Sequence, residues 1–185
     1  LIFLLKEKKQ SVSTLGKGNF FSFFKYWTIA TPEFRKVVPG LLLFALFNSS
    51  DIFLLLITKA SIGNETVSIL GVAFNSDSIT IGAYVFYNLV YAAISYPMGM
   101  LADRFSPRTI VIAGFILFAI VYAGFAFSPS VPVIFILFAL YGIYAAATEG
   151  VIKAWISNLA HGENTATAIG FYTSCESIGT LLASI

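Results

Sequence analysis

Two carboxylates lie inside long apolar stretches of this chain: Asp51, just past the middle of one stretch, and Glu176, well inside another. A carboxylate near the centre of a bilayer costs about 2.5–3.5 kcal/mol on insertion scales, so such a residue is a functional candidate by default. Desolvation disfavours the charged form, which makes proton uptake and release near neutral pH possible. The pattern predicts that Asp51 or Glu176 couples proton movement to the movement of a solute. The alternative is a carboxyl group hydrogen-bonded to a neighbouring helix for packing alone.

Other polar and aromatic side chains near the middle of the apolar stretches are candidates for contact with a small-molecule substrate. They are Asn48, Ser50, Tyr84, Tyr87, Asn88 and Tyr144. Aromatic residues in such stretches more often serve packing, so this prediction is weighed against a purely structural role.

Catalytic and metal chemistry have little support in the sequence. There is one cysteine, Cys175, and one histidine, His161, whereas zinc sites need three or four ligands. No stretch pairs a nucleophile with a base, and no glycine-rich phosphate loop is present. We therefore expect no enzyme, no cofactor and no metal site. The net charge of +2 is too small to indicate a nucleic-acid partner.

The composition places these residues in a membrane. Hydrophobic residues make up 58% of the 185 and charged residues 11%, against about 25% charged residues in soluble domains. A helix needs about 20 mostly apolar residues to cross a bilayer. Five stretches meet this requirement, near residues 37–60, 79–102, 108–127, 131–158 and 164–185. Because unpaired backbone groups are not tolerated in lipid, the predicted fold is an all-α, polytopic membrane bundle.

The basic residues predict the orientation. Lys and Arg gather before the first span, around Arg104 and Arg108, and at Lys153. These places fall on one side when five helices alternate in direction, so residues 6–36 and the loops near 103–108 and 158–164 are expected in the cytoplasm. The chain opens and closes in apolar stretches, which suggests a piece of a longer protein. Residues 1–36 would then hold the end of an earlier span and a cytoplasmic linker.

The turn between the second and third spans has a readable design. Pro97 cannot donate a backbone hydrogen bond and should kink the second span. Gly99 should let another helix approach closely. Ser106 and Pro107 read as the N-cap and first residue of the third span. The short turn makes these two spans antiparallel neighbours.

The run Gly99-Met100-Leu101-Ala102-Asp103-Arg104 resembles the G-x-L-A-D-R-x-G-R-[RK] signature of the major facilitator superfamily. The segments around Asn48–Leu56 and Thr148–Ala154 are similar to the seventh and tenth helices of a bacterial branch of that family. The resemblance implies a half of a twelve-helix transporter, helices seven to eleven, in a bacterial plasma membrane. Ser106 stands where the family has Gly.

The resemblance also implies a cytoplasmic gate, formed by Gly99, Leu101, Asp103, Arg104, Arg108, Glu149 and Lys153. Glu149 and Lys153 are four residues apart with the acid first, the favourable helical order for an ion pair. With Asp103 and Arg108 they are expected to form a charge cluster that holds one conformation closed. The alternative is an ordinary interfacial ion pair. Gly142, Ala146 and Gly150 form a small-residue stripe that should let another helix pack closely.

The function that these expectations favour is secondary active transport of a small solute by alternating access. Protons or another coupling ion, the bilayer and the missing N-terminal half would be its partners. The alternative is a non-transporting membrane scaffold or receptor of the same fold.

Overall fold

The computed structural model describes residues 25–48, 51–63, 66–69, 72–127, 129–160 and 164–183. Within them the chain is almost entirely helical, which confirms the predicted all-α bundle. The helices are α1 (Tyr26–Ile29), α2 (Pro32–Phe47), α3 (Asp51–Ile62), α4 (Ser76–Phe105), α5 (Pro107–Ala126), α6 (Val131–Leu159) and α7 (Thr165–Ala183). Strands β1 (Val67–Ile69) and β2 (Val72–Phe74) form a short antiparallel hairpin between α3 and α4, in which Ser68 is opposite Ala73. This hairpin is not predicted from the sequence.

Four segments of the described chain are long and apolar enough to cross a membrane: Pro32–Ile62, Ser76–Phe105, Pro107–Ala126 and Val131–Leu159. They correspond to the first four predicted spans. The fifth predicted span forms α7 but is not among the four, so its passage through the membrane stays a prediction. The first span begins at Pro32, not near residue 37, because Thr31 caps the helix and Pro32 occupies its first position.

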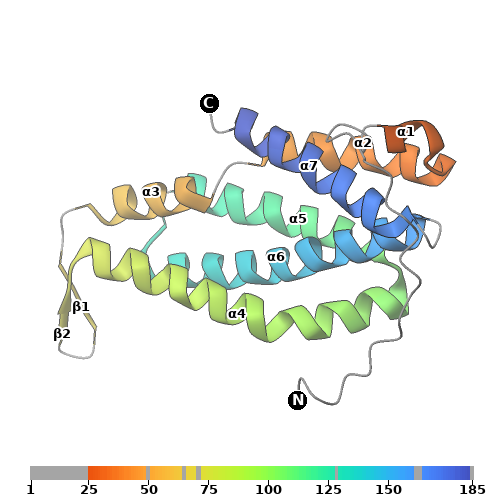
Figure 1. Cartoon of the computed structure of the whole chain (residues 1–185). Helices are drawn as coiled ribbons and strands as arrows, with labels where there is room; N and C mark the ends of the chain where they lie inside the picture. Colours follow the sequence, from red (N-terminus) through yellow and green to blue (C-terminus); the bar gives the residue numbers. More distant parts are fainter. Residues whose placement is uncertain are drawn as a thin grey trace, which may run out of the picture.

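The first span is not one continuous helix. Its first half, α2, ends at Phe47, where Asn48 has an extended backbone with φ −78° and ψ 109°, and its second half, α3, is described from Asp51. In Figure 1 the two halves run along different lines, with α2 beside α7 and α3 nearer α4. The first span therefore consists of two successive helices. Broken helices of this kind are tolerated at membrane depth only where protein or a cavity surrounds them.

Helix α6 runs through the middle of the bundle, with α4 on one side and α2 and α7 on the other (Figure 1). Helix α6 packs most extensively against α4 and α5. Successive long helices reverse direction, as predicted, and the hairpin lies at the end where α3 finishes and α4 starts. At the opposite end, the Thr31 hydroxyl donates a hydrogen bond to the Leu159 carbonyl at 2.9 Å, which joins the start of α2 to the end of α6.

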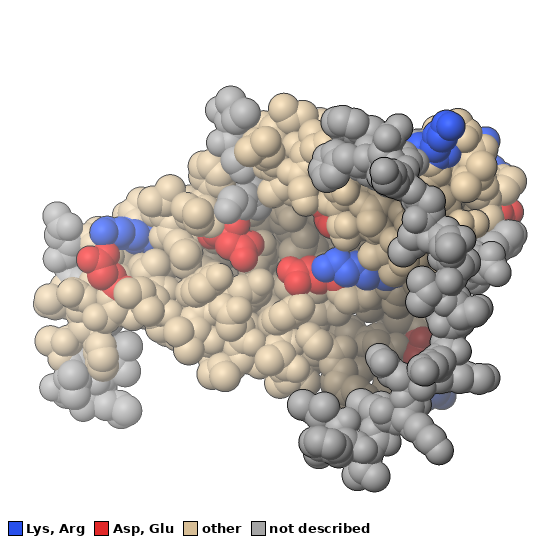
Figure 2. Space-filling model, in the orientation of Figure 1, with Lys and Arg blue, Asp and Glu red and all other residues tan. Residues whose placement is uncertain are grey.

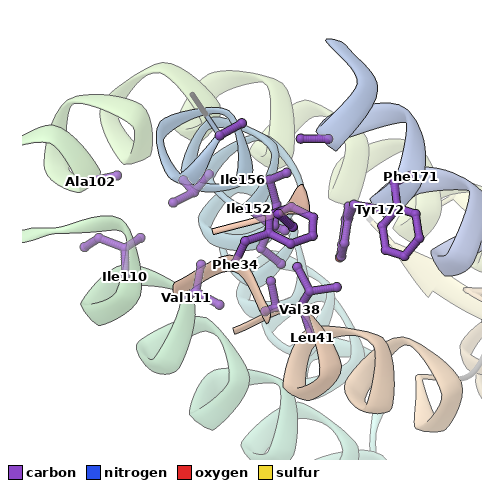
Figure 3. Packing of buried hydrophobic residues seen from close by; sticks show 14 of the residues in the cluster. Phe34, Val38, Leu41, Ala102, Ile110, Val111, Ile152, Ile156, Phe171 and Tyr172 are labelled. Carbon is purple, nitrogen blue, oxygen red and sulfur yellow. The ribbon is translucent and has the colours of Figure 1, made fainter. Parts of the chain in front are cut away.

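The outer face of the bundle is apolar. On α5, Ile112, Ile116 and Ile120 recur every fourth residue and are each about half exposed. A continuous outward stripe of this kind suits a lipid environment. The interior has two apolar clusters. One surrounds Phe34, Val111 and Ile156 at the end where α4 meets α5 (Figure 3), and the other lies around Leu54 and Phe138 toward the hairpin.

The turn from α4 to α5 is built as the sequence predicts, with one feature that it does not reveal. Ser106 caps α5, its hydroxyl accepting a hydrogen bond from the Thr109 amide, and Pro107 follows at the first helical position. Ser106 has φ +101° and ψ 140°, a conformation that favours glycine. The residue that departs from the family signature thus occupies a position that suits the signature's glycine.

Small residues bring the helices together at some of the predicted positions. A Cβ placed on Gly142 would lie 2.9 Å from the Tyr87 carbonyl oxygen of α4, and one on Gly114 would lie 2.7 Å from a methyl of Thr148. Gly99 and Gly150 differ, because no described atom lies within 4 Å of a Cβ at either position. No described helix approaches Gly99 closely, so a close contact there stays a prediction, and the stripe on α6 works through Gly142 and buried Ala146.

Gly142→Ala should destabilise the protein by about 1–3 kcal/mol, because the new methyl group meets the α4 backbone and forces α4 and α6 apart. Gly82→Ala, in α4 with open space around it, is the matched control, and better helix propensity should leave it neutral or up to about 1 kcal/mol more stable. Unfolding in mixed detergent micelles measures both. Equal effects of the two substitutions would contradict the close packing at Gly142.

Ser106→Gly should stabilise the protein by about 1 kcal/mol. Glycine relieves a strained backbone worth roughly 1–3 kcal/mol, and the loss of the serine cap costs only a few tenths of a kcal/mol when glycine replaces it. Ser106→Ala keeps the strain and removes the cap, so it should lose about 1 kcal/mol. The midpoints of thermal unfolding should therefore move in opposite directions; a lower midpoint for Ser106→Gly would rule out the strain.

Candidate functional site

A cavity of about 270 Å³ opens beside the break in the first span, between α2, α3, α6 and α7. We call it the central cavity. Figure 2 shows acidic surface gathered around a hollow near the middle of the molecule, with basic surface beside it. The polar and aromatic residues that line the cavity are Phe44, Asn48, Asp51, Tyr141, Tyr144, Thr148, Glu149, Lys153, Tyr172, Glu176 and Thr180. Asn48 and Asp51 thus share one site with Glu176, which is distant from them in the sequence.

Asp51 begins α3, directly after the break. A carboxylate in the first turn of a helix is stabilised by the helix dipole. The Tyr141 hydroxyl of α6 donates a hydrogen bond of 2.6 Å to Asp51 Oδ1, which fixes the carboxylate against the central helix. Asp51 is half-buried, so it is held by the protein and still open to the cavity.

Asn48 lies on the other side of the break, at the end of α2. Its Nδ2 is 3.4 Å from the Tyr144 hydroxyl, a long hydrogen bond. Its Oδ1 is buried and has no hydrogen-bond partner among the described residues. A buried carbonyl oxygen without a donor is costly, so the break leaves one acceptor unsatisfied beside the cavity.

The other two carboxylates of the cavity are also bound by tyrosine hydroxyls. Glu176 accepts a hydrogen bond of 3.1 Å from Tyr172, one turn earlier on α7. Glu149 of α6 accepts one of 2.9 Å from Tyr91 of α4. Lys153 lies one turn beyond Glu149 but makes no ion pair within 4.0 Å with any described carboxylate. The predicted Glu149–Lys153 ion pair is therefore wrong for this structure, in which Glu149 accepts the hydrogen bond from Tyr91 instead.

Three of the predicted substrate contacts, Tyr84, Tyr87 and Asn88, do not line the central cavity. Tyr87 is buried in the apolar cluster near the hairpin, where its ring packs 5.2 Å from that of Tyr141. Asn88 is exposed and donates to the Tyr84 carbonyl at 2.8 Å, within its own helix. Ser50 lies outside the described residues.

The signature residues at the α4–α5 turn are separate from the central cavity. Gly99 and Asp103 line a second cavity of about 260 Å³ between α4 and α6, and Arg108 lines a third, beside α2. Leu101 and Arg104 are exposed. The structure thus brings Glu149 and Lys153 to the central cavity and does not gather them with Asp103 and Arg108. The role of these residues as a gate stays a prediction.

Sequence reasoning missed the tyrosines that hold the carboxylates: Tyr91, Tyr141 and Tyr172. One signal was present for Tyr172, because it precedes Glu176 by four residues and so shares its helix face. For Tyr141, the spacing to Tyr144 and Thr148 marks one face of α6. Nothing local links Tyr141 to Asp51 or Tyr91 to Glu149, because these contacts join different helices.

The three carboxylates of the central cavity are arranged around it rather than gathered at one point. Among the described residues, no three His, Cys, Asp or Glu side chains lie close enough to hold a metal ion. The carboxylates come from α3, α6 and α7 and surround the cavity from different sides. Each carboxylate can therefore contact a solute independently of the other two.

Tyr141→Phe should lower stability by about 1.5–3 kcal/mol, the contribution of a hydrogen bond to a charged group. In an Asp51→Asn background the same substitution should cost clearly less, because the charged acceptor is gone. Tyr84→Phe, outside the central cavity, is the control and should have little effect. Unfolding in mixed micelles for all four members of the cycle measures the coupling; strictly additive losses would show that the 2.6 Å contact contributes nothing.

Comparison with known proteins identifies the family. The model of the Major Facilitator Superfamily matches residues 35–185. An uncharacterised MFS-type transporter of Methanocaldococcus jannaschii is 37% identical over 107 residues, which are 58% of this chain and 27% of that protein. The match thus spans a minor part of the relative's length. No solved structure matches the chain. Because the family model covers most of a chain that folds into membrane-spanning helices, this multi-pass membrane protein belongs to the major facilitator superfamily.

Proposed function

We propose that the chain is the C-terminal half of a secondary active transporter, helices seven to eleven, and that it moves a small solute by alternating access. The observation that carries the proposal is the central cavity, where a broken span, three carboxylates and one lysine meet inside an apolar bundle. Transporters of this kind place their sites near the membrane midplane at discontinuous helices, and one half rocks against the other. The other half of the transporter is a required partner in this proposal.

Proton coupling is assigned to Asp51 and Glu176. Each is half-buried, faces the cavity and accepts a hydrogen bond from one tyrosine hydroxyl. A carboxyl group in that setting can exchange a proton with a solute-filled or water-filled cavity while the tyrosine holds its position. Asn48 and Tyr144 would orient the solute at the break. A site that exchanges a proton and orients a solute in this way serves transport of the solute and not its enzymatic conversion.

The end of the bundle that carries Arg35, Lys36, Arg104 and Arg108 would face the cytoplasm of a bacterium, following the positive-inside rule. The hairpin would face outward. At the cytoplasmic end, Asp103, Arg104 and Arg108 with Gly99 and Leu101 would form the gate, and Glu149 and Lys153 would close the inner end of the central cavity.

Asp51→Asn and Glu176→Gln should each reduce solute flux driven by a pH gradient, and at least one should lose the coupling while keeping solute exchange. The measurement is uptake by proteoliposomes that contain the full-length protein, screened against a panel of labelled solutes with and without an imposed gradient. Asp77→Asn is the control, because Asp77 pairs with Lys59 on the surface near the hairpin.

Full gradient-driven flux in both variants would remove the proton-coupling assignment. Absence of flux for every solute, with the protein folded, would favour a membrane scaffold or receptor of the same fold.

A further inference from the structure

We propose that the central cavity accepts an organic cation that carries amino or guanidino groups. This inference rests on the proposed function, since it names the substrate class of the same site. It depends on three properties of the cavity wall: its charge, the balance of its hydrogen-bonding groups and its aromatic surface.

The charge of the wall favours a cation. Asp51, Glu149 and Glu176 contribute three carboxylates, and Lys153 contributes one ammonium group. The wall therefore has a formal excess of two negative charges, in surroundings with few other charged groups. An anionic solute would be repelled by most of the wall, whereas a cation would neutralise it.

The hydrogen-bonding groups favour a solute that donates. The hydroxyls of Tyr141 and Tyr172 already donate to carboxylates, and that of Thr148 donates to the Tyr144 carbonyl of its own helix. Each of the three carboxylates keeps free acceptor positions toward a solute, whereas the main donors left are the Lys153 ammonium group and the Tyr144 hydroxyl, which accepts a hydrogen bond from Asn48 Nδ2. Ammonium and guanidinium groups carry several N–H donors and no acceptor, so they complement such a wall.

The arrangement favours an organic ion over a bare metal ion. Among the described residues, no three His, Cys, Asp or Glu side chains gather as a metal site would require, whereas a solute with an extended body can reach carboxylates that come from different helices. The rings of Phe44, Tyr141 and Tyr144 form a connected group beside the cavity, with centroids 6.4 Å apart for Phe44 and Tyr144 and 5.2 Å apart for Tyr141 and Tyr144. Aromatic faces attract cations and pack against apolar carbon.

The positive charge of Lys153 predicts the direction in which cation affinity should change on mutation. Its ammonium group lines the same cavity without an ion pair to a described carboxylate. It therefore opposes a bound cation. Removal of this charge should strengthen cation binding, whereas removal of a carboxylate should weaken it.

The test is calorimetric titration of the full-length protein in detergent. The cationic probes are benzylamine, 1,4-diaminobutane and agmatine, and benzoate and succinate are the anions of matched shape. At least one cation should bind and the anions should not. Glu149→Gln and Glu176→Gln should each weaken that binding roughly tenfold or more, and Lys153→Gln should strengthen it. Asp77→Asn, a carboxylate outside the cavity, should leave it unchanged.

Binding of the anions alone, loss of binding in Lys153→Gln, or no binding of any of the three cations would overturn the proposal. Failure of the proposed transport function can be distinguished from failure of this inference. A protein that binds cations in this carboxylate-dependent way but moves no solute in proteoliposomes keeps the inference and loses transport. A protein that transports only anionic or uncharged solutes keeps transport and loses the inference.

Discussion

The central cavity depends on hydrogen bonds from tyrosine hydroxyls to carboxylates. Tyr141 holds Asp51, Tyr91 holds Glu149 and Tyr172 holds Glu176. Asp51 and Glu176 are half-buried in an apolar bundle, where a carboxylate without such a partner would be expensive, and a hydroxyl can satisfy it without adding a second full charge. Two of the three bonds join different helices, so they also fix α3 and α4 against α6. The same contacts that make the charges tolerable therefore assemble the site.

The break in the first span is the second condition for the site. A continuous helix would satisfy the Asn48 backbone groups internally and would present Asp51 as one side chain among many. Because α2 ends at Phe47 and α3 starts at Asp51, the acid occupies the first turn of a new helix and meets its positive end. The polar residues then lie between two apolar clusters, one toward the α4–α5 turn and one toward the hairpin. The two apolar clusters hold the helices together on either side of the cavity.

Much of this fold could be predicted, because apolar stretches and turn residues are local signals. The ends of α5 and α6 agree closely with the prediction, and Ser106 and Pro107 start α5 as their types indicate. Asp51 and Glu176 could be selected as site residues because charges in apolar stretches are rare. The break at Asn48, the role of Tyr141 and the separation of Asp103 from Glu149 could not be predicted, because each depends on which helices become neighbours. The sequence pattern predicts which face of a helix is buried, but it does not predict which other helix packs against that face.

The packing around α6 is unequal on its two sides, and this has a mechanical consequence. Toward α4 and α5, Gly142 and Gly114 allow contacts so close that a single methyl group would not fit without a shift. Toward α2 and α7, the boundary is packed around Phe34 and Ile156 but opens beside the break into a cavity lined with polar side chains. A load applied to the bundle would therefore meet a stiff block of three helices and a compliant flank of two. Deformation would concentrate in that flank, where a few rotamer changes suffice and no closely packed backbone has to separate.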